Sequence, residues 1–515
     1  MASRNGQDRE QYMIMQLSKQ SIGQISPKGI ELPGTDIFRL PEKVLQFGTG
    51  VLLRGLTDYF IDKANKNKIF NGRIVVVKST DSAGADTFDK QDGLYTLCVR
   101  GIENGTTIEE NMVNASISRV LSAKQQWAEI LECASKPEME MVISNTTEVG
   151  LVLTNDNIHD SPPASFPGKL LAFLYERYRF FKGDKTKGMV IIPTELIPNN
   201  GDKLFSILFE LSLQNKLDNG FTQWMKEANY FCNSLVDRIV PGKLSVTEQA
   251  KMEEKYGYRD DLMIMSEVYR LWAIESADEK VKTVLSFSKA DSGVVIAPDI
   301  TLFRELKLRL LNGSHTLSCG LAHLAGFITV KQAMRDELFF DFISKLMLEE
   351  IAPAIQEKNI SIEQANDFAL KVLDRFRNPF IEHQWLSITL QYSSKMNMRN
   401  VPTLIKYVDR FKKIPQHIAL GFAAYFLFMK AVEVSDHKYY GELNGRKYLI
   451  NDESASYFYD TWKLNNAEKV VNTVLANQKL WQHDLVMING FAAAVTGFLQ
   501  SLMDKGANSI LKELA

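Results

Sequence analysis

The sequence predicts an α/β protein with two parts: an N-terminal domain built on a parallel sheet and a mainly α-helical C-terminal domain. Three observations predict this. A short apolar stretch at 43–47 runs directly into a glycine turn at 48–50 and a helical stretch at 56–64. Strand-like and helical stretches then alternate up to about residue 300, as in a helix-covered parallel sheet. Beyond that point long helical patterns dominate.

A chain of 515 residues is too long for one ordinary core and predicts at least two domains. Residues 1–40 are polar and contain Pro27, Pro33 and Gly34, which is typical of an extension or arm. We expect the sheet domain at 41–300 and the helical domain at 301–515, with the hinge near Pro298.

The expected elements follow from apolar runs and helical spacing. The strands are expected at 43–47, 74–77, 139–144, 188–192 and 292–297. Helices of the first domain are expected at 56–64, 123–134 and 170–181. Those of the second are expected at 302–325, 331–349, 362–376, 416–434, 467–477 and 490–505. The charge-rich stretch 437–451 predicts a surface loop or small hairpin.

Composition excludes several classes of protein. The chain is 45% hydrophobic and 24% charged with a formal net charge of −2, so no basic excess indicates a nucleic acid or an anionic membrane as partner. No apolar run approaches the roughly 20 residues that span a bilayer. The N-terminal stretch lacks the apolar core of a signal peptide, so a cytoplasmic location is the default expectation. No obligatory protein partner is evident.

The cysteines and histidines are scattered. Four cysteines stand far apart without a CxxC pair, and the seven histidines form no HExxH motif. A disulfide framework or a zinc site is therefore not expected, and an enzyme of this sequence would work without a protein-bound metal.

The glycine turn is the first candidate site. Strand, glycine turn and helix form the Rossmann layout that places a pyrophosphate on a helix N-terminus. Gly48 permits the tight turn and Gly50 lets the backbone approach phosphate, but Leu53 replaces the third glycine of GxGxxG. After the second strand, Lys78 stands where an acid would hold the ribose hydroxyls, and Asp81 follows. These residues leave the choice between the two nicotinamide cofactors open.

The second candidate site lies on the helix expected at 302–325. At about 100° per residue of α-helix, Lys307, Asn312 and His315 share one side of it, with His315 between the other two. An amine, an amide and an imidazole suit proton transfer at a carbonyl or alcohol. An exposed helix with ordinary polar residues is the competing interpretation.

Six motifs occur in one order along nearly the whole chain after the arm. They are Gln46-Phe-Gly-Thr-Gly50 with Arg54, Gln91-Asp-Gly-Leu-Tyr-Thr96, Ser144-Asn-Thr-Thr-Glu148, Asn233-Ser-Leu-Val-Asp-Arg-Ile239, Lys307-x4-Asn312-x2-His315 and Arg375-Phe-x-Asn-Pro379. Together they resemble the mannitol dehydrogenase family of long-chain polyol dehydrogenases and reductases. The resemblance implies a Rossmann-type domain that binds NAD, a helical domain that carries catalytic groups, and metal-independent catalysis.

The resemblance also implies roles for single residues. Lys307 is the expected general acid and base, Asn312 the donor to the alkoxide, and His315 a group that fixes a substrate hydroxyl or orients the lysine. Glu148 either contacts the nicotinamide region or caps a helix. The expected cofactor-binding residues are Phe47, Gly48, Thr49, Gly50, Val51, Leu52, Arg54, Asp81, Asn145, Thr146 and Glu148.

Four stretches resemble more closely the members of the family that act on hexuronates. These are Ile192–Ile197 with Asn200, Leu235–Val240, Leu311–Thr316 and Arg375–His383. They imply NADH-dependent, reversible reduction of D-tagaturonate, a small sugar acid, to D-altronate.

The expected substrate residues are Arg375, Arg377, His383, Glu195, Asn200 and Asp237. Arg377 and His383 are basic where the polyol enzymes have no base, and we expect Arg377 above all to bind the carboxylate.

A departure and several alternatives remain open. Polyol enzymes carry a second catalytic asparagine where this chain has Leu196, so Asn200 is a possible helper for Asn312. Glu195 is alternatively a structural acid, and Asp237 with Arg238 alternatively a buried ion pair. The same scaffold could serve fructuronate or mannitol, or a non-catalytic sensor of sugar acids.

Overall fold

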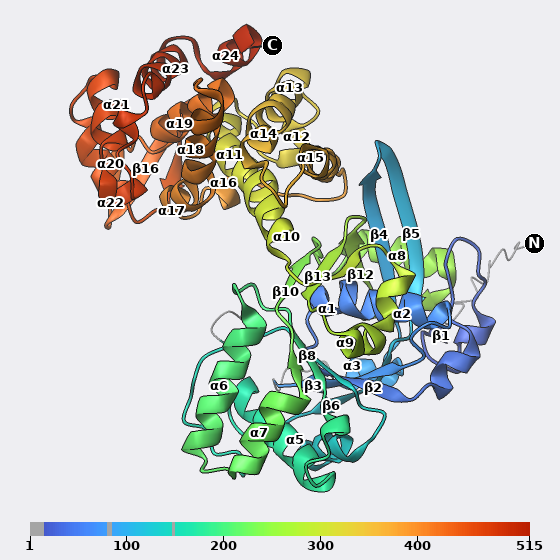
Figure 1. Ribbon diagram of the computed structural model, residues 1–515. Coiled ribbons are helices and arrows are strands. Elements are labelled where there is room, and N and C mark those ends of the chain that lie inside the picture. The colour runs from blue at the N-terminus through green and yellow to red at the C-terminus, as the bar shows by residue number, and fades with distance from the viewer. Residues whose placement is uncertain (1–14, 80–84, 147–149, 515) are drawn as a thin grey trace, which may run out of the picture. The chain divides into compact units, whose positions relative to one another are not determined.

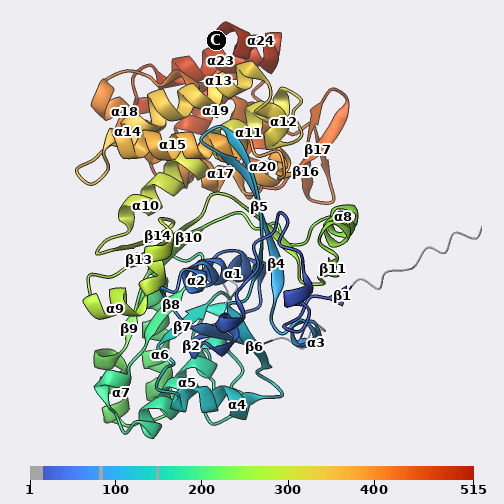
Figure 2. The same ribbon diagram turned by 90° about the vertical axis from the view of Figure 1, so that its right-hand side faces the viewer.

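The computed structural model describes residues 15–79, 85–146 and 150–514. The chain divides into two compact units (Figures 1 and 2). The first comprises Met1–Arg100 and Ile108–Ile300, and the second Gly101–Thr107 and Thr301–Ala515. Among the described helices, none is long and apolar enough to cross a membrane.

The first unit is built on a six-stranded sheet with the order β6-β3-β2-β7-β8-β9. Every neighbouring pair in it is parallel. The strand order runs outward from β2 in both directions, as in doubly wound sheets whose ligands bind at the carboxyl ends near the switch point. The strands are β2 (Glu42–Phe47), β3 (Arg73–Lys78), β6 (Ile117–Ser122), β7 (Met141–Ser144), β8 (Val190–Pro193) and β9 (Tyr230–Phe231).

Both faces of this sheet are buried, because successive side chains of a strand point to opposite faces. Val44, Ile74 and Val76 pack with the helices that follow the glycine turn. Leu45 and Val75 pack on the other face with the helices of residues 166–228. These near-continuous apolar runs are why the sequence predicts β2, β3, β7 and β8, whereas it does not predict the outer strands β6 and β9.

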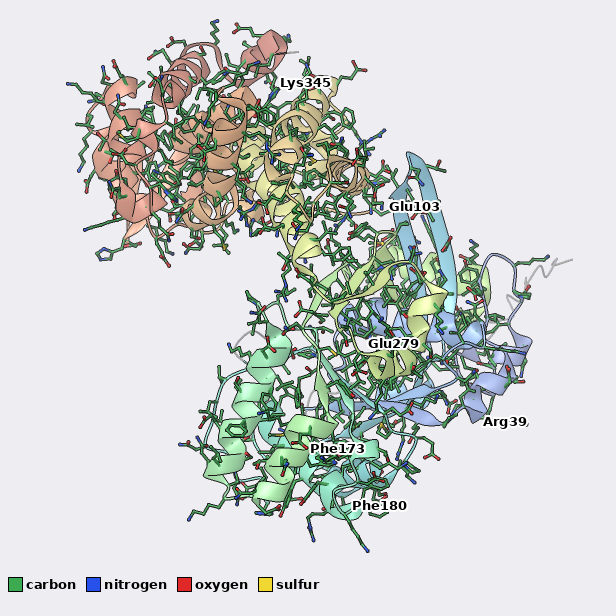
Figure 3. All side chains as sticks on the ribbon, viewed as in Figure 1. Arg39, Glu103, Phe173, Phe180, Glu279 and Lys345 are labelled. Carbon is green, nitrogen blue, oxygen red and sulfur yellow. The ribbon has the colours of Figure 1, made fainter. Side chains whose placement is uncertain are left out.

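The helices of the first unit fill the connections between strands. In α5, Phe173 is fully buried against the sheet whereas Phe180 is 55% exposed (Figure 3), so the helix has one core face. The helices are α1 (Val51–Gly55), α2 (Thr57–Lys66), α3 (Ala85–Lys90), α4 (Trp127–Glu132), α5 (Phe166–Phe180), α6 (Asn200–Gln214), α7 (Asn219–Ala228), α8 (Val246–Tyr256) and α9 (Glu279–Val284).

Smaller sheets complete the first unit. One has the order β12-β4-β5, from Ile264–Glu267, Tyr95–Glu103 and Thr106–Asn114, and another the order β10-β13-β14, from Ser234–Asp237, Leu271–Glu275 and Val294–Ala297. The strand expected at 292–297 therefore exists, but it belongs to this separate sheet and not to the main one.

The segment at 15–40 is packed on the first unit. Its strand β1 (Met15–Gln16) pairs in parallel with β11 (Tyr258–Arg259). Leu17, Ile22 and Ile37 are buried in a cluster with residues of the stretch 244–263. These apolar residues, spaced among polar ones, give the segment a core contact.

The second unit is helical, and three of its segments are π-helical: η7 (Lys307–Gly313), η8 (Leu346–Ile351) and η9 (Met396–Asn400). The α-helices are α10 (Thr301–Leu306), α11 (Ser314–Leu324), α12 (Val330–Ala333), α13 (Glu337–Lys345), α14 (Ala352–Ile355), α15 (Ile362–Phe376), α16 (Trp385–Ile388), α17 (Tyr392–Lys395), α18 (Val401–Phe411), α19 (Gln416–Phe428), α20 (Ala455–Trp462), α21 (Ala467–Leu475), α22 (Gln478–Trp481), α23 (Phe491–Lys505) and α24 (Ala507–Leu514).

The charge-rich stretch at 437–451 forms the hairpin of a small antiparallel sheet. Its strands are β15 (Glu433–Ser435), β16 (Lys438–Leu443) and β17 (Arg446–Ile450). The expected hairpin is thus present, with a third strand added.

Candidate active site

The glycine turn lies at the carboxyl end of β2, the central strand of the main sheet. Gly48 has φ of +128°, and a Cβ there would come within 3.1 Å of the carbonyl oxygen of Asn145. Only glycine fits this backbone conformation and close approach. Around Gly50, by contrast, the described residues other than its two chain neighbours place no atom within 4 Å of an added Cβ. The turn is fixed on one side and open on the other.

The residues after the turn divide by burial. Thr49, Val51 and Leu52 are half-buried, while Phe47 and Arg54 are buried. The Arg54 guanidinium donates to the carbonyl of Leu262 at 2.8 Å and lies over two aromatic rings. Arg54 is therefore occupied within the first unit, whereas the turn itself is accessible.

Glu195 connects the ends of β7 and β8. It is 2% exposed, and one carboxylate oxygen accepts from the backbone N–H of Thr146 at 2.8 Å and from its hydroxyl at 3.1 Å. The other oxygen accepts from Ser144 at 3.2 Å. Burial raises the pKa of Glu195 against these hydrogen bonds. Its contacts hold a loop in place, in line with the structural interpretation. Asn145 is tied to the same loop through Thr194.

Asn200 has no hydrogen-bonding capacity left for a ligand. Its amide nitrogen donates to the carbonyls of Pro193, Glu195 and Ser234 at 2.9, 3.0 and 3.1 Å. Its oxygen accepts from the N–H groups of Gly201 and Ser234. An amide offers two donors and one oxygen acceptor, and all are used here. Leu196, at the position of the missing asparagine, is 60% exposed.

Asp237 and Arg238 end β10 and are both buried. The Arg238 guanidinium donates to the carbonyls of Glu267 and Gly55 and lies 4.6 Å from the Tyr59 ring centre. Burial lowers the pKa of Arg238 to about 10. Arg238 thus has a structural role.

Lys78, at the end of β3, is buried. The expected cofactor residues Asp81 and Glu148 lie outside the described residues.

Lys307 and Asn312 stand on η7, which corrects the expected regular α-helix. A π-helix bonds residue i to residue i+5, so these two residues, five apart, lie about one turn apart on the same side. Both are half-buried. Gly313 allows the neighbouring segment η9 to approach, since a Cβ there would lie 2.9 Å from Oδ1 of Asn400. The π-helical turn and this contact together set the position of Asn312.

His315 is the second residue of α11 and is 8% exposed. Its ring stacks on Phe376 with the ring centres 3.8 Å apart and meets the edges of His383 and Trp385. Burial, aided by His383, Arg375 and Arg399, holds the pKa of His315 well below its usual value. The imidazole is therefore neutral near neutral pH, with one nitrogen able to donate and the other to accept.

Arg375, His383 and Arg399 surround this histidine. Arg375 is 6% exposed and His383 half-buried, and burial lowers the pKa of His383. Arg399 is not among the site residues predicted from the sequence. It approaches from η9, and its guanidinium donates to the hydroxyl of Thr316, which is 83 positions away in sequence. No local sequence pattern marks it.

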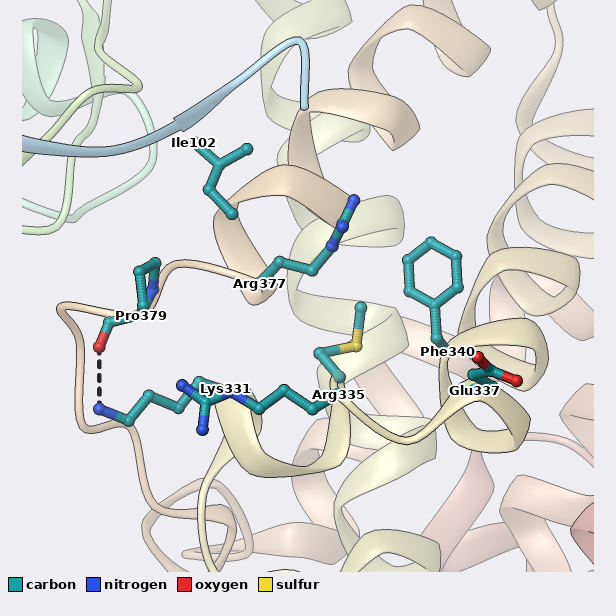
Figure 4. A pocket seen from close by; sticks show the side chains of 8 residues that line it. Ile102, Lys331, Arg335, Glu337, Phe340, Arg377 and Pro379 are labelled. Atoms are coloured by element: carbon teal, nitrogen blue, oxygen red, sulfur yellow. Dashed lines mark hydrogen bonds between the residues drawn. The ribbon is translucent and has the colours of Figure 1, made fainter. Parts of the chain in front are cut away.

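Arg377 is placed elsewhere, although it follows Arg375 by only two positions. It is exposed, and its guanidinium lies 5.4 Å from the ring centre of Phe340. There it lines a hollow of about 440 Å³ (Figure 4). Lys331, on the same hollow, donates to the carbonyl of Pro379 at 2.9 Å. His315 is not among the residues that line this hollow.

Among the described residues, no group of three or more His, Cys, Asp or Glu side chains could hold a metal ion. The second unit instead gathers an amine, an amide, a neutral imidazole and two guanidiniums. These are groups for moving a proton and binding an oxygen-rich molecule. With a doubly wound sheet and its open glycine turn in the same chain, the fold and these residues define a dehydrogenase-like protein of two domains.

Comparison with known protein families shows to which family the chain belongs. The model of the mannitol dehydrogenase Rossmann domain matches residues 42–285, and that of the mannitol dehydrogenase C-terminal domain matches residues 299–503. The chain belongs to the mannitol dehydrogenase family.

Curated relatives cover nearly the whole chain. An altronate oxidoreductase of Bacillus subtilis is 38% identical over 92% of this chain and 95% of its own length. One of Bacteroides thetaiotaomicron is 36% identical over 92% and 96%. The resemblance expected from the six motifs is confirmed.

Solved structures share the fold. A Pseudomonas fluorescens mannitol 2-dehydrogenase in ternary complex with NAD and D-mannitol has a TM-score of 0.66 at 24% identity, covering 97% of this chain and 99% of the other. A D-sorbitol dehydrogenase in substrate-free form has a TM-score of 0.78 at 20% identity, covering 96% and 100%. The expected architecture of a Rossmann-type domain followed by a helical domain is confirmed.

Proposed function

We propose that this protein is an NAD-dependent oxidoreductase that interconverts D-tagaturonate and D-altronate, a step of hexuronate breakdown. The observation that carries the proposal is the group of Lys307, Asn312 and His315 in one helical stretch, with Arg375 and Arg399 close to His315. The chain that contains this group is 38% identical to an altronate oxidoreductase. An amine, an amide and an imidazole suit a carbonyl and alcohol pair, and arginines suit an acidic sugar. We place the enzyme in the cytoplasm, in keeping with four buried cysteines that are all free thiols.

The glycine turn fits a dinucleotide. The space around Gly50 is open, and the backbone there is extended, without a side-chain cap on α1. The first N–H groups of the helix therefore remain for phosphate oxygens. Phe47, Gly48, Thr49, Gly50, Val51 and Leu52 would hold the pyrophosphate end, with Asn145 and Thr146 beside them. When bound, the nicotinamide supplies or accepts the hydride.

The chain's own groups handle the proton and the oxygen. Lys307 donates a proton to the oxygen of the ketone as it becomes an alcohol, and takes one back in the oxidation. The Asn312 amide donates a hydrogen bond to the same oxygen while its charge develops, a contribution of about 2.7–4 kcal/mol for comparable donors. His315, neutral and fixed by its stack on Phe376, hydrogen-bonds a substrate hydroxyl. His383 lies at its edge and extends this polar surface.

The test is a substrate comparison with purified protein. NADH is mixed with tagaturonate, fructuronate or fructose, and its absorbance is followed. Oxidation with tagaturonate at the highest kcat/KM is the expected result. A preference for fructuronate or fructose would assign the same chemistry to another substrate. No oxidation with any of the three would favour a sugar-acid sensor and overturn the proposal.

A further inference from the structure

Arg399 is held beside the catalytic segment by two hydrogen bonds. Its Nη1 donates to the backbone carbonyl of Asn312 at 3.4 Å and to the hydroxyl of Thr316 at 3.0 Å. Thr316 is fully buried, and Arg399 itself is half-buried. The guanidinium is thus fixed next to the residue whose side chain is to bind the reacting oxygen.

The other edge of this guanidinium is unused. Nε of Arg399 is buried and has no hydrogen-bond acceptor among the described residues, and no hydrogen bond of Nη2 is formed there either. An unsatisfied buried donor on a charged group is costly. The edge made by Nε and Nη2 is the one that binds both oxygens of a carboxylate in parallel.

No acidic side chain in the described part of the second unit forms an ion pair with Arg399. Arg309, the neighbouring cation, pairs with Glu305 at 3.1 Å. Arg399 has only Cys319 as an electrostatic partner of opposite sign, and burial raises the pKa of that thiol to about 12. The thiol is therefore uncharged at neutral pH, and the charge of Arg399 remains uncompensated.

We propose that Arg399 binds the carboxylate of the hexuronate substrate and makes the enzyme select acids over uncharged sugars. The inference rests on the proposed function. Arg399 bridges Asn312 and Thr316, which are four residues, or about 6 Å of helix rise, apart. In an extended 5-keto hexuronate, four C–C bonds, or about 5 Å, separate the carboxylate carbon from the ketone carbon. The two lengths are of similar size, so the proposal places the ketone at the Asn312 side chain and the carboxylate at the guanidinium held beside it.

This assignment differs from the expectation for Arg377. That residue is exposed and lies over the ring of Phe340. Arg399, in contrast, is close enough to contribute to the lowered pKa of His315. A cation that affects the imidazole electrostatically is also close enough to affect a sugar acid bound beside it.

The test compares Arg399→Met with wild type on two substrates, tagaturonate and fructose. We expect kcat/KM for tagaturonate to fall about ten- to a hundredfold, the size of one charge-assisted hydrogen bond, mainly through KM. Activity on fructose should change less than about twofold, because fructose has no carboxylate. Arg399→Lys should restore part of the loss, since it keeps the charge but not the two-pronged geometry. Lys413→Met removes an exposed charge of the same unit and serves as the control.

Two outcomes would overturn the proposal. Equal loss on both substrates would make Arg399 a support for Asn312 alone. Loss in Arg377→Met without loss in Arg399→Met would move the carboxylate to the hollow beside Phe340.

Binding of D-altronate, measured by calorimetry on wild type and Arg399→Met, separates this inference from the proposed function. Tighter binding to wild type supports Arg399 as the carboxylate site even if no hexuronate is turned over. Equal binding overturns it.

Discussion

Lys307 stands at the first position of η7, half-buried and one turn below Asn312. We expect Lys307→Ala to lower kcat about 10²- to 10⁴-fold, the usual contribution of a general acid or base. Binding of NADH should survive, because the glycine turn belongs to the other unit. Stopped-flow or steady-state assays measure kcat. Fluorescence titration measures the binding of NADH. A variant that keeps more than about a tenth of the wild-type kcat, a loss under about 1.4 kcal/mol, would exclude this role.

His323 is a second histidine on α11, half-buried and about two turns beyond His315. Its ring meets the rings of Phe428 and Tyr448, its Nε2 has no partner among the described residues, and burial lowers its pKa from 6.5 to about 4. As the pH falls from about 7 toward 4, the imidazole of His323 therefore takes up a proton in the unfolded chain before it does so in the folded protein. This uptake favours the unfolded chain, so stability is lost over that range.

His323→Phe should keep the ring packing and remove this loss. We expect the fall in the free energy of unfolding between pH 7 and pH 4.5 to be smaller by about 1–2 kcal/mol in the variant, after allowing for partial exposure. Urea unfolding followed by circular dichroism measures it. An unchanged pH dependence would mean that His323 is already charged in the folded protein at pH 4.5.

At the scale of elements, the π-helical turn of η7 depends on the close contact at Gly313. An added methyl group there would press on the Asn400 amide at 2.9 Å. Gly313→Ala should cost about 1–3 kcal/mol of stability through overpacking and lower kcat by displacing Asn312. Gly497→Ala is the matched control: it lies in the helix α23 with nothing within 4 Å, and alanine should be neutral or stabilising there. Thermal unfolding measures the stability of the two variants, and activity assays measure their kcat. Equal stability and equal kcat in the two variants would show that the contact at Gly313 is not important.

Helix α15 and segment η7 show what the sequence can predict about elements and what it cannot. The range 362–376 is correct at both ends, because Ser361 and Gln364 form a capping box that marks the start. The helix expected at 302–325 is right in extent but not in kind. Nothing local in 307–313 distinguishes a π-turn from an α-turn. The wider turn of η7 occurs where this segment packs against η9. Because η9 lies at residues 396–400, far along the chain, this contact cannot be predicted from the sequence of 307–313.

For the whole molecule, we expect activity without metal. The donor side chains needed for a metal site are scattered in the sequence, and the described residues contain no cluster of them. Exhaustive chelation followed by assay in metal-free buffer should leave the rate unchanged. A rate that is lost on chelation and restored only by added zinc would contradict this expectation.

The candidate site as a whole was predictable only where its residues are close in sequence. The glycine turn at 48–50 and the triplet of Lys307, Asn312 and His315 each lie within a short stretch, so spacing marks them as candidates. Their roles are implied by the resemblance of the six motifs and stay predictions. Arg399 joins the triplet through tertiary packing, and no spacing rule connects the two stretches. Conversely, Asn200 matched a motif but uses its whole amide to link strands and a helix. Whether a polar residue is free for a ligand depends on its partners.

The pairing of β1 with β11 has a consequence for how the chain folds during synthesis. Met15 is in register with Tyr258, so β1, the first strand of the described residues, has no partner until more than half of the sequence has left the ribosome. The apolar residues Leu17, Ile22 and Ile37, buried in the finished protein with Leu244 and Met252, stay uncovered until then. Contacts between residues so far apart in sequence form late, and the apolar surface that they cover stays exposed to solvent until they form. The nascent segment at 15–40 is therefore where we expect chaperones to bind while the parallel sheet is still being assembled.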